Sequence, residues 1–456
     1  MTAPREGSLE TPTRHPIDWR NPAFYSQDDL FTELERVFNH CHGCRRCVSL
    51  CDSFPTLFDL VDESSTLEID GVDQADYWKV VDQCYLCDLC YMTKCPYVPP
   101  HEWGIDFPHL MLRAKATRFR KRGTRLRDRV LSSTDSVGKA AGLPGISVIV
   151  NTANRSRAIR KIMQTVGGIH ADARLPPYES DSLRTRLGKR SLTDESQVVA
   201  AGPTSGKVAL FATCYGNYNE PDLGDDLVAV LEHNSVTVTI AEKEWCCGMP
   251  KLELGDLASV QRAKDRNIPT LARLVDDGWD LVAVVPSCVL MFKQELPLMF
   301  PDDPDVSRVA KAFYDPFEYL MFRHTAGQLN TEFSESLGDV LYQASCHQRV
   351  QNIGPKTRDV LSLIPDTAVT VLERCSGHDG TYGVKTETFD KAMKIGRPVM
   401  NRIQQLQPDY YGSDCPIAGQ HLANGVDDRS QAVHPIAPDR GQTDTRESDD
   451  SGTIRE

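Results

Sequence analysis

Several features that define common protein classes are missing from this 456-residue chain. No stretch reaches the roughly 18 to 20 consecutive apolar residues that cross a bilayer, and the longest candidate, "AAGLPGISVIV", is short and contains Pro144. The N-terminal "MTAPREGSLETPTRHP" lacks the apolar core of a signal peptide. A net charge of −13 argues against a general nucleic-acid binder. We therefore expect a cytoplasmic protein with no nucleic-acid partner.

Cysteine, by contrast, is abundant, with fifteen residues. Because cytoplasmic thiols stay reduced, so many cysteines are expected to be metal ligands or redox groups rather than disulfides. Eight of them lie between positions 41 and 95, in two runs. The run "HCHGCRRCVSLCDS" has the spacing C-x2-C-x2-C-x3-C, and the run "QCYLCDLCYMTKCP" has the spacing C-x2-C-x2-C-x4-C-P.

The two runs predict two [4Fe–4S] clusters. Short turns direct the first three thiolates of each run toward one centre, and the fourth ligand comes from the distant cysteine of the other run, as in two-cluster ferredoxins. This pairing assigns Cys41, Cys44, Cys47 and Cys95 to one cluster, and Cys84, Cys87, Cys90 and Cys51 to the other. The alternative is a pair of structural zinc sites, which prefer two CxxC pairs separated by a longer loop and fit these triplets poorly.

The residues around the runs are expected to be helical. In "SQDDLFTELERVFNH", Ser26 is a suitable N-cap and the apolar residues share one helical face. His42 and His101 lie close to the runs and are expected to be polar surface residues rather than ligands. The sequence thus predicts a helical two-cluster ferredoxin domain over residues 28–110, after a flexible N-terminus over residues 1–27.

Residues 111–200 are predicted to form a basic helical segment followed by a linker. Between positions 113 and 129 the chain carries nine Lys or Arg and one Asp, a local reversal of its overall charge. Three interpretations stay open: docking to anionic lipid head groups, docking to an acidic partner protein, and a solvated basic helix.

The second half of the chain contains an internal repeat in which strands alternate with helices, which predicts two α/β units with parallel sheets. The units are expected over residues 201–325 and 335–423, with a disordered acidic tail over residues 424–456. Every cysteine of the repeat follows an expected strand, and in parallel sheets sites form at the carboxyl ends of strands. The first copy gathers Cys214, Cys246, Cys247 and Cys288, and the second gathers Cys346, Cys375 and Cys415.

The second copy is the weaker candidate for a metal centre. Where the first copy has Cys246-Cys247-Gly248, the second has Cys375-Ser376-Gly377, and serine is a poorer soft-metal ligand than cysteine. His347 and His378 could compensate as ligands, but hydrogen-bonding roles are the stronger expectation for both.

The motifs "CCGMP", "PSC", "CHQR" and "SGHDGTYG", behind two cysteine runs, resemble the C subunit of anaerobic glycerol-3-phosphate dehydrogenase and related heterodisulfide reductase subunits with the cysteine-rich CCG domain. The resemblance covers residues 28–422. It implies an α+β multidomain chain with a helical two-[4Fe–4S] ferredoxin domain and a tandem pair of Rossmann-like CCG domains. It also implies peripheral membrane association beside a flavoprotein dehydrogenase subunit. The departures from the family motif are Ser376 and the missing distal cysteines after Cys288 and Cys415.

These features predict an iron–sulfur electron-transfer subunit. Electrons would pass from a flavoprotein partner through two clusters to a CCG-domain site, which holds a further metal centre in its first copy, and on to an acceptor such as a membrane quinone. No G-x-G-x-x-G follows an expected strand, so the chain is not expected to be the dehydrogenase itself. The alternatives are a CCG-domain catalyst that reduces a disulfide or serves a rubrerythrin-type peroxide-reducing system, and a non-redox iron–sulfur scaffold.

Overall fold

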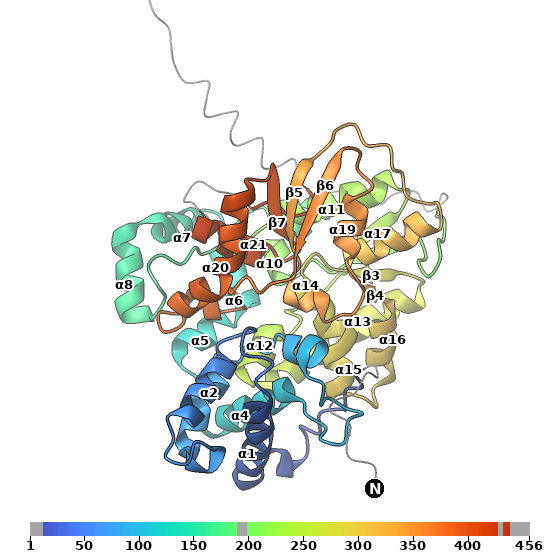
Figure 1. Ribbon diagram of the computed structural model, residues 1–456. Helices are drawn as coiled ribbons and strands as arrows, with labels where there is room; N and C mark the ends of the chain where they lie inside the picture. Colours follow the sequence, from blue (N-terminus) through green and yellow to red (C-terminus); the bar gives the residue numbers. More distant parts are fainter. Residues whose placement is uncertain (1–11, 189–197, 427–431, 438–456) are drawn as a thin grey trace, which may run out of the picture.

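The computed structural model describes residues 12–188, 198–426 and 432–437. A helical region at the N-terminal end packs beneath two α/β units, and a group of short helices connects these parts (Figure 1). Parts of the expected flexible N-terminus and acidic tail, together with residues 189–197, lie outside the described residues. No helix in the described ranges is long and apolar enough to cross a membrane.

The N-terminal helical region spans residues 27–122. It consists of α1 (Gln27–Cys44), α2 (Ser53–Asp62), α3 (Tyr77–Gln83) and α4 (Phe107–Arg122), with a π-helical turn, η4, at Cys90–Lys94. As the sequence predicts, the Ser26 side chain caps α1 by accepting a hydrogen bond from the Asp29 amide. The apolar face of α1 is buried through Leu30, Leu34, Val37 and Phe38.

The described part of the N-terminal segment, residues 12–26, packs against the body of the protein, whereas the sequence predicts a flexible N-terminus there. The Trp19 indole donates to the Met299 carbonyl at 2.9 Å, and the Ile17 amide donates to the Leu298 carbonyl at 2.8 Å. Both side chains are buried. Because the partners lie nearly 300 residues away, nothing in the local sequence pattern reveals this contact.

The connecting region contains five helices. They are α5 (Leu126–Leu131), α6 (Thr134–Ala141), α7 (Ile146–Arg155), α8 (Arg157–Gly167) and α9 (Leu183–Leu187). Helices α7 and α8 form a hairpin at the side of the molecule (Figure 1). The described residues of the expected linker pack against the first α/β copy. Leu183 is fully buried, and the Arg184 amide donates to the Asn217 side chain at 3.0 Å.

The first α/β copy, residues 207–325, contains a four-stranded parallel sheet in the order β2-β1-β3-β4. Val208 of the central strand pairs with both Val238 and Asp280. The first three strands occur where the sequence predicts them, and β4 is an additional short edge strand. The strands are β1 (Lys207–Leu210), β2 (Thr237–Ile240), β3 (Asp280–Val282) and β4 (Phe313–Tyr314).

The helices of the first copy cover its sheet and carry its thiols. The longer ones are α11 (Pro221–His233), α13 (Leu257–Asp276), α16 (Pro304–Ala312) and α17 (Pro316–Thr325). The shorter ones are α10 (Cys214–Tyr218), α12 (Met249–Leu254), α14 (Pro286–Leu290), the π-helical turn η6 (Met291–Glu295) and α15 (Leu296–Met299).

The second α/β copy, residues 338–426, repeats the first three strands in the order β6-β5-β7, also parallel. Its strands are β5 (Gly338–Gln343), β6 (Thr367–Leu372) and β7 (Tyr410–Ser413). Its helices are α18 (Cys346–Arg349), α19 (Lys356–Leu361), α20 (Phe389–Leu406) and α21 (Pro416–Val426). Beyond α21, the Val433 amide donates to the Tyr411 carbonyl at 3.0 Å, so residues 432–437, expected in the tail, pack on this sheet.

Helix α13 continues through Pro269, although proline inside a sequence that favours a helix predicts a break at that position. An interior proline costs roughly 3 kcal/mol. Burial of several apolar side chains of the same helix offsets that cost, at roughly 1.5 to 3 kcal/mol for each large one. These side chains are Leu257, Val260, Ile268 and Leu271.

Candidate functional site

The first thiol group consists of Cys41, Cys44, Cys47 and Cys95. The last turn of α1 presents Cys41 and Cys44, the following turn presents Cys47, and Cys95 follows η4. All four line one small pocket, together with Phe54, Phe58 and Ile105. Burial, followed by the charges of the other three cysteines, raises the pKa of Cys41 well above its usual value. The structure thus brings together the four residues assigned to the first cluster.

The second thiol group consists of Cys51, Cys84, Cys87 and Cys90. Leu86 and Asp88 have φ values of 60°, and these left-handed residues turn the chain between successive cysteines of the run. Burial raises the pKa of Cys90, and the neighbouring Cys47, Cys84 and Cys51 raise it further. The influence of Cys47 shows that the two thiol groups are neighbours.

The first-copy thiols, Cys214, Cys246, Cys247 and Cys288, meet at the carboxyl ends of β1, β2 and β3. Hydrogen bonds from Cys214 and Cys247 lower the pKa of Cys246 well below its usual value, despite burial. The corresponding bonds raise the pKa of Cys214 and of Cys247. The four thiols therefore lie close enough to share protons, as expected for a thiol group that can receive a cationic centre.

Two residues of α6, for which the sequence gives no prediction, complete this site. The Thr134 hydroxyl donates to Cys246 Sγ at 3.4 Å, and the Asp135 carboxylate accepts a hydrogen bond from the Cys246 amide. Burial, followed by the charge of Cys246, raises the pKa of Asp135 to about 6. Sequence offers no signal for this contact, because more than 100 residues separate α6 from Cys246.

The second-copy thiols, Cys346, Cys375 and Cys415, also gather at the ends of their strands. Burial raises the pKa of Cys346, and the charges of Asp379, Cys375 and Cys415 raise it further. The buried Asp379 Oδ2 has no hydrogen-bond partner among the described residues. Asp379 also raises the pKa of Cys87, which lies in the N-terminal helical region. This carboxyl group, unnoticed in the sequence, therefore lies between the second thiol group and the second copy.

The four histidines near the cysteines have hydrogen-bonding or packing partners. His347 Nδ1 lies 2.7 Å from the Ser287 hydroxyl, and burial lowers the pKa of His347 to about 4. Burial likewise lowers the pKa of His378 to about 3, and the His378 amide donates to the Ser376 hydroxyl. His101 accepts from the Trp103 amide at 3.1 Å, and His42 lies against the Arg45 side chain.

A buried ionic cluster joins the N-terminal segment to the second thiol group. The Arg14 guanidinium contacts Asp88 at 2.5 Å, Asp106 at 2.9 Å and Glu295 at 3.5 Å. His109 Nδ1 lies 3.1 Å from Asp106. Because Asp88 stands between Cys87 and Cys90, the N-terminal segment fixes the conformation of this cysteine run through a side chain that no sequence motif singles out.

The chemistry of the thiol groups fits multi-iron clusters. In each of the three complete groups of four, neighbouring thiols raise the pKa of a central member, namely Cys41, Cys90 and Cys247, so four thiolates need a compensating cationic group. In the described part of the chain, no three Cys, His, Asp or Glu residues converge on a position suited to one metal ion. A cubane cluster requires a wider arrangement of ligands than a single metal ion, because each cysteine binds a separate iron atom.

The fold and these sites define a class of protein: a tandem α/β repeat with thiols at the strand ends, joined to a helical region that carries two cysteine groups. The family model for the CCG cysteine-rich domain matches residues 208–293 and 340–422. Lactate utilization protein A of Bacillus pumilus is 30% identical over 243 residues, which cover 50% of this chain and 96% of that protein.

A second type of relative covers more of the chain. The C subunit of anaerobic glycerol-3-phosphate dehydrogenase from Escherichia coli K12 is 28% identical over 317 residues, which cover 68% of this chain and 76% of that protein. The chain belongs to the CCG cysteine-rich-domain family that includes these proteins, which confirms the resemblance derived from the sequence.

Proposed function

We propose that the chain is an iron–sulfur electron-transfer subunit of an oxidoreductase complex. The observation that carries this proposal is the succession of thiol groups through the molecule. The charge of Cys47 in the first group raises the pKa of Cys90 in the second. The charges of Cys346 and Cys375 in the second copy raise the pKa of Cys87 in the second group. An isolated structural site needs no such contacts, whereas electron transfer between centres needs them to be close.

The first and second thiol groups would each hold one [4Fe–4S] cluster, in a ferredoxin-like helical domain. When bound, such clusters accept and release single electrons at potentials set by burial and by hydrogen bonds to the sulfurs. The protein supplies the surroundings: Arg14 places a cation near Asp88, and Lys115 donates to the Cys84 carbonyl. The first-copy thiols would hold a further iron–sulfur centre.

The electron donor would be a flavoprotein dehydrogenase subunit on another chain. One relative is named as the C subunit of a glycerol-3-phosphate dehydrogenase, and others are named for lactate utilization. A 2-hydroxyacid or glycerol-3-phosphate dehydrogenase is therefore the proposed class of partner. A membrane quinone is the proposed acceptor.

This proposal includes peripheral contact with the cytoplasmic face of a membrane. Residues 113–129 are not the surface proposed for that contact. Most basic side chains of that segment serve internal contacts: Arg113 donates to the Phe24 carbonyl, Arg118 pairs with Asp82, and Arg127 pairs with Glu387. The α7–α8 hairpin instead exposes apolar side chains, with exposed fractions of 69% for Ile149 and 85% for Val166. Helices with such a face lie in lipid interfaces.

Anaerobic purification with iron and sulfide analysis tests the electron-transfer proposal. The helical region should bind about eight iron atoms, four for each cluster. Cys44→Ser and Cys87→Ser should each remove one EPR signal and leave the other detectable, because Cys44 and Cys87 belong to different groups. Stoichiometric zinc without iron after anaerobic reconstitution would overturn the proposal.

A second candidate function is direct reduction of a disulfide at the first copy, with electrons from the clusters. The lowered pKa of Cys246, whose Sγ accepts a hydrogen bond from the Thr134 hydroxyl at 3.4 Å, favours it, because a thiolate is the nucleophile in thiol–disulfide exchange. Turnover of a disulfide by the purified chain with a chemical electron donor would support this candidate over simple electron relay. A rubrerythrin-type peroxide-reducing partner would need the same electron route.

A further inference from the structure

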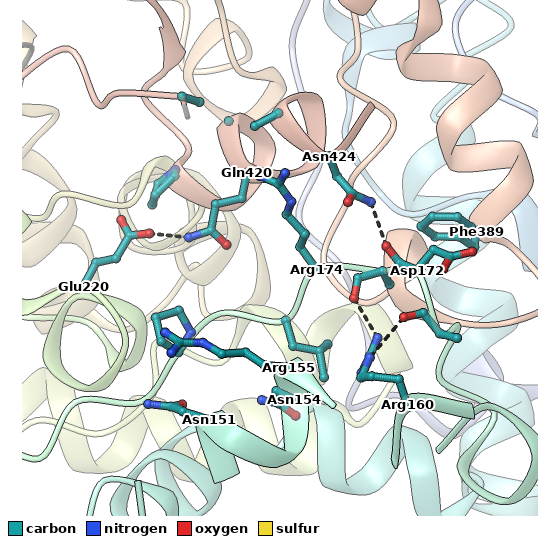
Figure 2. A pocket seen from close by; sticks show the side chains of 18 of the residues that line it. Asn151, Asn154, Arg155, Arg160, Asp172, Arg174, Glu220, Phe389, Gln420 and Asn424 are labelled. Carbon is teal, nitrogen blue, oxygen red and sulfur yellow. Dashed lines mark hydrogen bonds between the residues drawn. The ribbon is translucent and has the colours of Figure 1, made fainter. Parts of the chain in front are cut away.

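A large cavity opens between the α7–α8 hairpin and the second α/β copy. Its volume is about 1240 Å³, more than enough for a small organic molecule. One wall comes from α7, α8 and residues 171–177, and the opposite wall comes from α20, α21 and residues 432–434. Figure 2 shows the cavity with the side chains that surround it.

The wall formed by the hairpin is strongly basic. Five basic residues line the cavity against two acidic residues, Asp172 and Glu220. The basic residues are Arg155, Arg157, Arg160, Lys161 and Arg174.

These cations differ in their partners. Arg160 is buried and donates to the backbone carbonyls of His170, Ala171 and Ala173, so it holds the wall in place. The side chains of Arg155, Arg157 and Lys161 have no hydrogen bond or ion pair within the part of the chain that the structure describes. Figure 2 shows the Arg155 and Arg174 side chains extending into the space between the walls. Arg155, Arg157 and Lys161 therefore offer the cavity positive charge that no described residue neutralises.

The opposite wall adjoins the thiols of both copies. Gln420 of α21 donates to the Tyr215 hydroxyl at 2.9 Å and to the Glu220 carboxylate. Tyr215 directly follows Cys214 of the first copy, and Cys415 is among the groups that raise its pKa. Ser413, two residues before Cys415, and Pro416, directly after it, also line the cavity. A molecule in this cavity would thus lie beside the junction of the two copies.

We propose that this cavity binds a small soluble molecule that carries at least two anionic groups, phosphate or carboxylate. The cations of α7 and α8 hold the anionic groups, and the internal hydrogen bonds of Asn151, Gln420 and Asn424 fix the walls around the rest of the ligand. This site concerns ligand binding alone, so it does not depend on the electron-transfer proposal.

A lipid head group carries the same chemistry, but the structure favours a soluble ligand. The exposed apolar side chains of the hairpin, including Val148, Ile149, Ile162 and Val166, are absent from the cavity lining. A lipid whose head group occupied the cavity could not place its acyl chains along that apolar face.

Isothermal titration of the full chain with inorganic phosphate, pyrophosphate and citrate tests the proposal. We expect saturable binding of pyrophosphate or citrate, weakened about tenfold in Arg155→Gln and again in Lys161→Gln, because a hydrogen bond to a charged group contributes on that scale. Lys311→Gln is the matched control, since Lys311 is an exposed cation of α16 outside the cavity. Thermal unfolding of each variant checks that it is folded.

Three outcomes would overturn the proposal. The first is absence of saturable binding of all three anions into the millimolar range. The second is an equal loss of binding in Lys311→Gln, which would indicate general charge attraction. The third is binding only to phosphatidylglycerol vesicles with the same dependence on Arg155, which would assign the cavity to a lipid head group.

Discussion

The hydroxyl oxygen of Tyr85 lies 3.5 Å from the sulfur of Cys375, although 290 residues separate them in the chain. Tyr85 stands between Cys84 and Cys87 of the second thiol group, and Cys375 belongs to the second copy. Burial, followed by the charges of nearby cysteines, raises the pKa of Tyr85 well above its usual value, so the hydroxyl stays protonated and can donate to a thiolate. This contact links the second thiol group directly to a thiol of the second copy.

The Tyr85–Cys375 contact predicts an effect of Tyr85→Phe on redox potential. Removing a hydrogen bond to a ligand sulfur destabilises the reduced, more negative state, so the potential of the centre that the weaker candidate group, Cys346, Cys375 and Cys415, would hold should fall. Potentiometric EPR titration measures it. Tyr91→Phe is the control, because the Tyr91 hydroxyl is buried without a hydrogen-bond partner among the described residues. An equal shift in both variants would show that the contact has no specific role.

The first-copy thiols predict a centre that can be lost independently. Cys247→Ala should remove the additional iron of the first copy and leave the EPR signals of the helical region, because the thiols that raise the pKa of Cys247, namely Cys246 and Cys288, belong to its own group. Iron analysis and EPR on the same sample provide the measurement. Unchanged iron content in Cys247→Ala would mean that this group stays metal-free.

Arg14 is expected to matter for stability. Arg14→Ala would leave Asp88, Asp106 and Glu295 as buried carboxylates without their shared cation. Removing one partner of a buried ion pair costs about 3 to 5 kcal/mol in free energy of unfolding. Arg122→Ala, at an exposed position near the end of α4, should change it by less than about 0.5 kcal/mol. Chemical denaturation followed by tryptophan fluorescence compares the two, and equal stability would contradict the expected role.

His109 predicts a pH dependence of stability. Burial lowers the pKa of His109, but the charge of Asp106 and the hydrogen bond to it outweigh burial and raise the value to about 9. The folded state therefore binds a proton that the unfolded chain releases near pH 6.5. The stabilisation is fully present below pH about 6.5 and is lost as the pH rises through about 9, a change of about 3 kcal/mol. His109→Gln should abolish this loss in denaturation curves recorded between these pH values.

The exposed face of α8 predicts membrane binding. Ile162→Ser combined with Val166→Ser should reduce flotation with anionic vesicles, because these side chains are 60% and 85% exposed and would enter the lipid interface. Leu406→Ser, at a 40% exposed residue of α20, is the control. Equal flotation of all variants would assign any vesicle binding to charge alone.

Much of the architecture follows from local patterns. The strands of both copies occur where runs of apolar, β-branched residues predict them, and α1 begins at the cap Ser26. The cysteine spacing predicted that the first three thiols of each run would meet, because the turns between them are determined locally. The exchange of the fourth cysteine between the runs was predicted from the pattern of two-cluster ferredoxins. The number and type of clusters that these thiols hold stay predictions.

The remaining features depend on contacts between distant segments. Arg14 forms its buried ion pairs because the fold places Glu295 and Asp106 beside it. Asp379 affects the pKa of Cys87 because the second copy packs against the helical region. The basic residues near position 118 looked like a docking surface, since sequence alone cannot show that Asp82 already pairs with Arg118. Helix α13 passes through Pro269 for the same reason, because tertiary burial outweighs a local cost.

One hydrophobic core runs without interruption from Leu30 and Phe38 of α1 to Leu210 and Phe317 of the first copy. The second copy has a separate small core around Leu341 and Leu422. The first copy therefore shares its core with the helical region, whereas the second copy has a core of its own. A fragment that contains the first copy alone would expose the apolar side chains that now pack against the helical region, so isolating this copy should favour aggregation.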